Sequence, residues 1–91
     1  MTRMLTQDQI ERFRRDGYLS PVRVMSEDAA NAVREKLQAY EQSTGGPLRG
    51  EFRHKSHLLF KFLSEVVHDE KILDAIEDLY GPDLLCWTTN F

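Results

Sequence analysis

The fold of this chain is decided by residues 55–91, which read KSHLLFKFLSEVVHDEKILDAIEDLYGPDLLCWTTNF. Apolar residues cover more than half the circumference of a helix predicted over residues 57–68, so that helix needs burial on two sides. A further helix is predicted over residues 69–80, and Gly81-Pro82 is suited to end it. The last stretch, residues 84–91, is rich in β-branched and aromatic residues and is predicted to be a strand.

Two more helices are predicted towards the N-terminus, over residues 6–16 and 26–43. Thr6 and Gln9 have the spacing of a capping box, in which each side chain satisfies a free backbone donor of the other residue. Gly17 follows the first of these helices and suits a left-handed helix stop. The predicted elements are therefore a set of helices followed by a strand.

The predicted strand has no partner in the sequence. A lone strand leaves its backbone donors and acceptors unpaired, and no second convincing strand is present. We therefore interpret residues 1–91 as the N-terminal portion of a single longer domain that continues past Phe91.

Composition excludes several function classes. The net charge is −3, and the Lys and Arg residues form no basic stripe of the kind that binds nucleic acid. The apolar runs are far too short to span a membrane, and the N-terminus has no apolar segment typical of a signal peptide. The chain has a single cysteine, Cys86, which excludes an internal disulfide and a thiolate zinc site and favours a cytoplasmic protein. Because Cys86 lies in an apolar stretch, we expect it in the core. We expect no nucleic-acid or membrane partner.

The histidines raise the question of a metal site. His54 and His57 are three residues apart, but no nearby cysteine completes a ligand set, and we interpret both as loop or helix-start residues. His68 precedes Asp69 and Glu70 in a His-x-carboxylate pattern, which a helix cap explains better. We assign no metal ligand and no catalytic residue within residues 1–91.

Lys55 and Asn90 are the polar residues with the clearest potential role. Lys55 directly precedes the most apolar segment, where its ammonium group either binds an anion or extends into solvent from an apolar surface. Asn90 lies near the end of the predicted strand, where it either faces a cavity or bonds to the backbone. Thr88 shares its face by strand alternation.

Two blocks of the sequence resemble one enzyme family. Residues 5–21, LTQDQIERFRRDGYLSP, are similar to the opening helix and Asp-Gly-Tyr turn of phytanoyl-CoA dioxygenase-like proteins. Residues 55–91 resemble the next block of that family, with its Lys-x-His-Leu-Leu-Phe entry, helix pair and Gly-Pro-Asp turn. The order and spacing of the two blocks carry the resemblance, which is weakest over residues 41–53.

The resemblance implies an α+β fold: a helical layer and the first strand of a truncated double-stranded β-helix (jelly-roll). It also implies an oxidoreductase, an Fe(II)- and 2-oxoglutarate-dependent dioxygenase that hydroxylates a small organic substrate. The family holds iron with a His-x-Asp pair and a distal His, which we expect beyond residue 91. The partner of this chain would then be the remainder of the oxygenase domain, and the chain alone is predicted to be inactive.

Three residues receive a role from the resemblance. Lys55 matches a lysine close to 2-oxoglutarate in relatives, and Asn90 matches a position that lines the same pocket. Thr88 is a weaker candidate on the face of Asn90. Two alternative functions remain open: a complete helical protein-interaction module that uses the apolar face of residues 58–67, and a catalytically dead oxygenase-like remnant.

Overall fold

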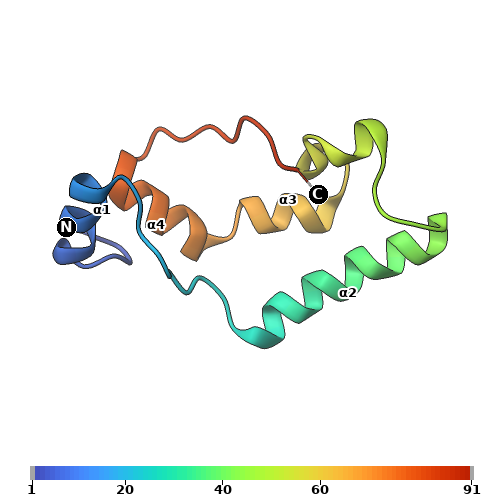
Figure 1. Ribbon diagram of the computed structural model, residues 1–91, viewed down its shortest axis with the longest axis horizontal. Coiled ribbons are helices and arrows are strands. Elements are labelled where there is room, and N and C mark those ends of the chain that lie inside the picture. Colours follow the sequence, from blue (N-terminus) through green and yellow to red (C-terminus); the bar gives the residue numbers. More distant parts are fainter. Residues whose placement is uncertain (1, 91) are drawn as a thin grey trace. The chain divides into compact units, whose positions relative to one another are not determined.

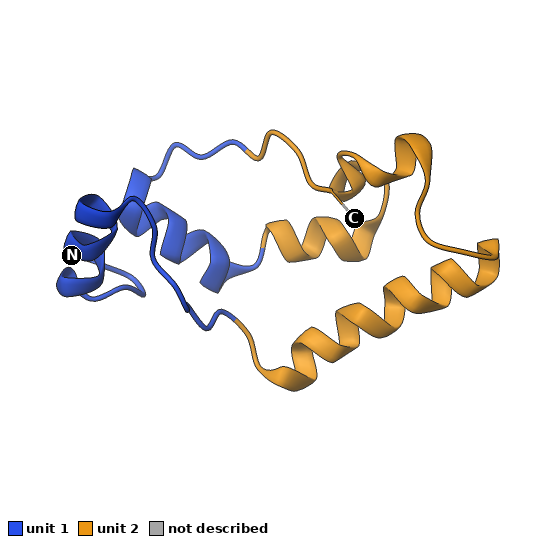
Figure 2. Cartoon of the chain, in the orientation of Figure 1, with its two compact units in different colours: residues 1–24, 69–85 blue, residues 25–68, 86–91 orange. Residues whose placement is uncertain are grey.

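The structure is a computed structural model that describes residues 2–90 (Figure 1). Its helical elements, in chain order, are α1 (Gln7–Asp16), α2 (Glu27–Thr44), η1 (Gly50–Arg53), η2 (Ser56–Leu58), α3 (Lys61–Val67) and α4 (Glu70–Tyr80), where η denotes a short 3-10 helix. The chain divides into two compact units (Figure 2). The first comprises residues 1–24 and 69–85, and the second comprises residues 25–68 and 86–91.

Helix α1, in the first unit, begins and ends as its local sequence dictates. The Thr6 hydroxyl oxygen accepts a hydrogen bond of 3.2 Å from the Gln9 N–H, and Gln9 Oε1 accepts one of 2.9 Å from the Thr6 N–H. The predicted capping box is therefore confirmed. Gly17 has a φ of 81° and ends the helix in the left-handed region.

Replacing Gly17 with alanine tests this helix end. An added Cβ would contact nothing within 4 Å, so its cost comes from the left-handed backbone alone. We expect Gly17→Ala to reduce the free energy of unfolding by about 1 kcal/mol, and Gly17→Asn to lose less, because asparagine tolerates this conformation. Urea unfolding followed by circular dichroism measures both. Equal losses for the two variants would contradict the backbone explanation.

The core of the first unit joins α1 to α4. Leu5, Ile10 and Ala75 are buried together, and the partly buried residues around them are Met4, Leu19, Val22 and Leu79. At the edge of this core the rings of Phe13 and Tyr80 meet edge to face, with centroids 5.8 Å apart. The spacing of the apolar residues along α1 and α4 thus produces one shared apolar face.

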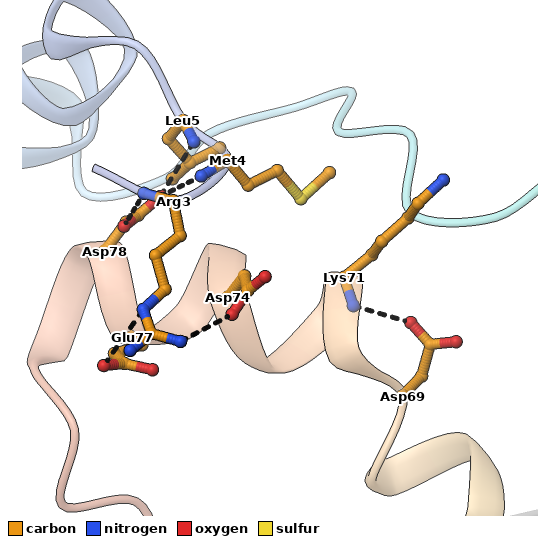
Figure 3. A network of polar contacts seen from close by, with 8 residues as sticks. All are labelled: Arg3, Met4, Leu5, Asp69, Lys71, Asp74, Glu77 and Asp78. Carbon is orange, nitrogen blue, oxygen red and sulfur yellow. Dashed lines mark hydrogen bonds and ion pairs between the residues drawn. The ribbon is translucent and has the colours of Figure 1, made fainter. Parts of the chain in front are cut away.

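Asp78 on α4 holds the start of the chain (Figure 3). Its carboxylate accepts hydrogen bonds of 2.8 Å from the backbone N–H groups of Arg3, Met4 and Leu5. Removal from water raises the pKa of Asp78, but these bonds and the Arg3 charge together hold the pKa below its ordinary value. Arg3 also forms ion pairs of 3.5 Å with Asp74 and Glu77.

The second unit is built on α2 and α3. The Ser26 hydroxyl oxygen accepts a hydrogen bond from the Ala29 N–H at the start of α2, and Gly45 ends that helix with a φ of 83°. The rings of Tyr40 on α2 and Phe60 meet edge to face with centroids 4.7 Å apart. Leu63 of α3 has only 1% of its surface exposed.

The helix predicted over residues 57–68 is interrupted. The segment starts as the 3-10 helix η2, and Phe60 is extended, with φ −123° and ψ 124°, directly before α3. Leu58 is 72% exposed and Leu59 is 52% exposed. The prediction from apolar content was therefore wrong about both the length and the burial of this helix. The helix is shorter because a single extended residue is enough to end a run of helical hydrogen bonds.

The strand predicted over residues 84–91 is wrong for residues 84–90, and Phe91 lies outside the described residues. Within the described chain the segment makes one isolated antiparallel bridge, between Asn90 and His54. The described fold is helical, which overturns the expected α+β class and its first jelly-roll strand. A strand needs a continuous backbone partner, and a single bridge does not supply one. Cys86 is consequently exposed rather than in the core.

Candidate functional site

The end of the described chain is held against the turn between η1 and η2, within the second unit (Figure 1). We call this contact the clasp and define it by the five residues His54, Lys55, His57, Thr89 and Asn90. The Lys55 N–H donates to the Thr89 carbonyl oxygen at 2.8 Å, next to the bridge between His54 and Asn90. The clasp therefore joins two segments that are more than 30 residues apart in the sequence.

His57 and Thr89 form the buried part of the clasp. His57 is 8% exposed, and its backbone N–H donates to the Thr89 hydroxyl oxygen at 3.2 Å. The imidazole Nδ1 of His57 lies 2.9 Å from the same oxygen. One threonine hydroxyl thus satisfies both a backbone and a side-chain nitrogen, which gives His57 and Thr89 an anchoring role.

Lys55 adopts a backbone conformation that is uncommon for its residue type. Its φ of 53° lies in the left-handed region although it is not a glycine. Such conformations cost free energy and concentrate at functional sites. The Lys55 Nζ lies 4.8 Å from the centroid of the Trp87 ring, a cation–π contact between two exposed side chains. The ammonium group thus lies against an aromatic face at the surface.

Asn90 forms a hydrogen bond with the imidazole ring of His54. Its Oδ1 lies 2.8 Å from the His54 Nδ1. An amide oxygen is only an acceptor, so His54 Nδ1 must carry the hydrogen of this bond. The second ring nitrogen, Nε2, has no hydrogen-bond partner within residues 2–90. Asn90 thereby determines which nitrogen of the imidazole is free.

A cleft of about 330 Å³ adjoins the clasp. Its lining residues are Glu51, Phe52, His54, Lys55, Leu58 and Leu59. Three of these residues are apolar and three carry ionisable side chains. A few convergent polar groups in an apolar cleft are typical of small-molecule sites, and the ammonium group favours an anionic ligand.

The three site residues predicted from the sequence lie in different surroundings. Lys55 lines the cleft, whereas Asn90 belongs to the clasp and touches a cleft residue, His54. The Thr88 hydroxyl donates to the Thr89 carbonyl oxygen at 3.4 Å and is not joined to the other two. Sequence reasoning missed His54 as a site residue, because nothing local to it indicates a bond to a residue 36 positions away.

The residues present do not fit an iron centre. In the part of the chain that the structure describes, no three His, Cys, Asp or Glu side chains are grouped to hold a metal ion. His68 Nδ1 bonds to the Ser64 carbonyl oxygen, and Asp69 caps α4 by accepting from the N–H groups of Lys71 and Ile72. No step of any reaction is therefore assigned to a metal held by these residues.

Comparisons with family models, curated proteins and solved structures find no match to this sequence. Across residues 2–90 no helix combines the length and the apolar character that crossing a membrane requires. The candidate site is a cleft lined by Glu51, His54 and Lys55, in which the clasp fixes His54 through its bond to Asn90.

Proposed function

We propose that this chain is the helical N-terminal part of an Fe(II)- and 2-oxoglutarate-dependent oxygenase that hydroxylates a small organic substrate. In this proposal Lys55 supplies a cationic group for a carboxylate of 2-oxoglutarate. The proposal rests on the resemblance of residues 5–21 and 55–91 to phytanoyl-CoA dioxygenase-like proteins. The iron would be held by residues beyond Phe91, where it would supply the oxygen chemistry.

The observation that carries the proposal is the placement of Lys55. Lys55 lines a cleft of about 330 Å³, and its left-handed backbone belongs to the clasp, where its N–H donates to the Thr89 carbonyl oxygen. The only carboxylate among the lining residues is Glu51, and no ion pair of Lys55 occurs among the described side chains. The volume of this cleft admits a dicarboxylate of the size of 2-oxoglutarate, and Lys55 offers a cationic group for one of its two carboxylates.

A second candidate function is supported by a different observation. Leu58, Leu59 and Trp87 are large apolar side chains that are each more than half exposed in the second unit. This exposure favours a helical module that binds another protein through the surface around η2. Such a module has no need for an anion, so it predicts no response of the cleft to 2-oxoglutarate.

The single tryptophan gives a direct test of the co-substrate site. Trp87 contacts the Lys55 ammonium, so we expect its fluorescence to change saturably when 2-oxoglutarate is added to the 91-residue chain. Lys55→Gln removes the charge and should weaken the apparent affinity about tenfold, the equivalent of one charge-assisted contact.

Lys36→Gln is the matched control, because Lys36 is an exposed lysine of α2 in the same unit. It should leave the affinity unchanged. An equal loss in both variants would reveal a non-specific charge effect. A wild-type chain with no saturable response would remove the co-substrate site and favour the interaction module.

A further inference from the structure

Residues 49–61 form a cationic segment in an otherwise acidic chain. The segment, RGEFRHKSHLLFK, contains four Lys and Arg residues and one Glu, which gives it a net charge of +3. The whole chain has a net charge of −3, so all the other residues together carry −6. This local excess is too small for a surface that follows nucleic-acid phosphates, but it favours an acidic partner over a basic one.

The cations of this segment lie at the surface of the described chain. Arg49, Lys55 and Lys61 are exposed, and none of them forms an ion pair with an acidic side chain among residues 2–90. Lys55 instead lies against the ring of Trp87, with its Nζ 4.8 Å from the centroid. The positive charges are therefore accessible to the carboxylates of a partner, with which they can form charge-assisted hydrogen bonds.

Exposed apolar side chains lie beside Lys55. Phe52, Leu58 and Leu59 line the same cleft as Lys55, and all three are exposed. Trp87 is also exposed and contacts the Lys55 ammonium. These five residues of the second unit line one cleft or touch a residue that does, and we define them as the docking surface. Apolar side chains with charged groups at their edge are typical of surfaces that bind another protein.

The docking surface continues into a second cleft. This cleft has a volume of about 200 Å³, and Phe52 and Arg49 are among its lining residues. Because Phe52 lines both clefts, a partner that crosses its ring reaches one cleft lined by Lys55 and another lined by Arg49. An extended or helical segment can therefore place successive side chains in two clefts, each with a cationic residue in its wall.

We infer that the docking surface binds an acidic segment of another protein, whose apolar side chains contact Leu58 and Leu59 and whose carboxylates pair with Lys55. This inference goes beyond the proposed oxygenase function and does not rest on it. A lipid surface suits the site less well, because Glu51 lines the same cleft and opposes uniformly anionic headgroups. A symmetric pair of copies suits it less well too, because it would bring two equally cationic surfaces together.

The experiment uses a short fluorescently labelled peptide of leucine and glutamate residues with blocked ends, titrated with the 91-residue chain and followed by fluorescence anisotropy. We expect saturable binding. Replacing every glutamate of the peptide with glutamine, or every leucine with serine, should each weaken the affinity at least about tenfold, because each change removes one of the two kinds of contact. Binding of the acidic peptide should also weaken between about 0.1 M and about 1 M salt, as the Debye length falls from about 10 Å to about 3 Å.

Substitutions in the chain locate the binding on the docking surface. Lys55→Gln should weaken the affinity for the acidic peptide about fivefold, and Leu58→Ser about tenfold. The matched controls are Lys36→Gln and Tyr18→Ser, which replace an exposed lysine and an exposed aromatic residue outside the docking surface. Both controls should bind as the wild type does. Circular dichroism verifies that every variant keeps its helices.

The outcomes separate an acidic protein segment from the other possible partners. The inference is overturned by absence of saturable binding, by equal binding of the glutamine peptide, or by equal binding of the serine peptide, which would show a general counter-ion effect. Adsorption to vesicles of phosphatidylcholine and phosphatidylserine without binding of the peptide would replace the protein segment with a lipid surface. A dimer in sedimentation equilibrium that Lys55→Gln dissociates would replace it with a second copy. None of these results depends on the response of Trp87 to 2-oxoglutarate, which tests the proposed function separately.

Discussion

Replacing Asp78 with asparagine is expected to release residues 3–5 from α4 and to lower the thermal midpoint of the first unit by roughly 5 °C or more. The carboxylate uses both oxygens to accept three backbone N–H groups, from Arg3, Met4 and Leu5. Asparagine has the same shape but turns an NH2 group towards one side of this donor set, which leaves one or two of these exposed or partly buried N–H groups without a protein acceptor. Faster hydrogen exchange at the Met4 and Leu5 amides would report the release directly.

Asp74→Asn is the matched control on the same helix. Among the described residues at the start of the chain, Asp74 contacts Arg3 through a long ion pair of 3.5 Å, which is worth little at a surface. Its substitution should change the midpoint far less than that of Asp78. Equal effects would show that helix charge, rather than the hydrogen bonds to the backbone, stabilises this contact.

We also expect the contact between Asp78 and residues 3–5 to be sensitive to acid. The pKa of Asp78 is lowered in the folded chain, so the stabilisation is present above the ordinary aspartate value of about 4 and is lost as the pH falls through the lowered folded value. Protection of the Met4 and Leu5 amides should therefore decrease below about pH 4 in the wild type. In Asp78→Asn this pH dependence should be absent, because the asparagine side chain does not titrate.

Replacing Leu63 with alanine should produce the largest loss in the second unit, about 2–5 kcal/mol in the free energy of unfolding. Leu63 is 1% exposed, the most buried large side chain in the part of the chain described. Its truncation removes apolar contacts and leaves a cavity. Urea unfolding followed by the fluorescence of Trp87 measures the loss, because unfolding separates that ring from the Lys55 ammonium.

Leu58→Ala provides the comparison. Leu58 is 72% exposed and lies five residues before Leu63, so its truncation should cost less than about 0.5 kcal/mol. A large loss at Leu58 would contradict its exposure on the surface around η2. Similar losses at both positions would contradict the assignment of Leu63 as the core of this unit.

Two segments of the chain have a composition that their structure does not follow. The apolar residues at positions 57–67 have the composition of a long buried helix, yet the extended Phe60 divides them into η2 and α3. The β-branched and aromatic residues near Trp87 have the composition of a strand, yet they remain unpaired apart from one bridge at Asn90. Composition describes what a segment favours, whereas a strand exists only where a second backbone segment pairs with it.

The sequence by itself determined the two ends of α1. Thr6 with Gln9, and Gly17 after α1, act within one or two turns, so their hydrogen bonds and φ values follow from neighbours in the chain. Only the tertiary structure decided the candidate site. The bond from His54 to Asn90 spans 36 residues and joins two separate segments of the second unit. Local hydrogen bonds can be predicted from spacing because the chain itself brings the partners together, whereas long-range ones require a fold.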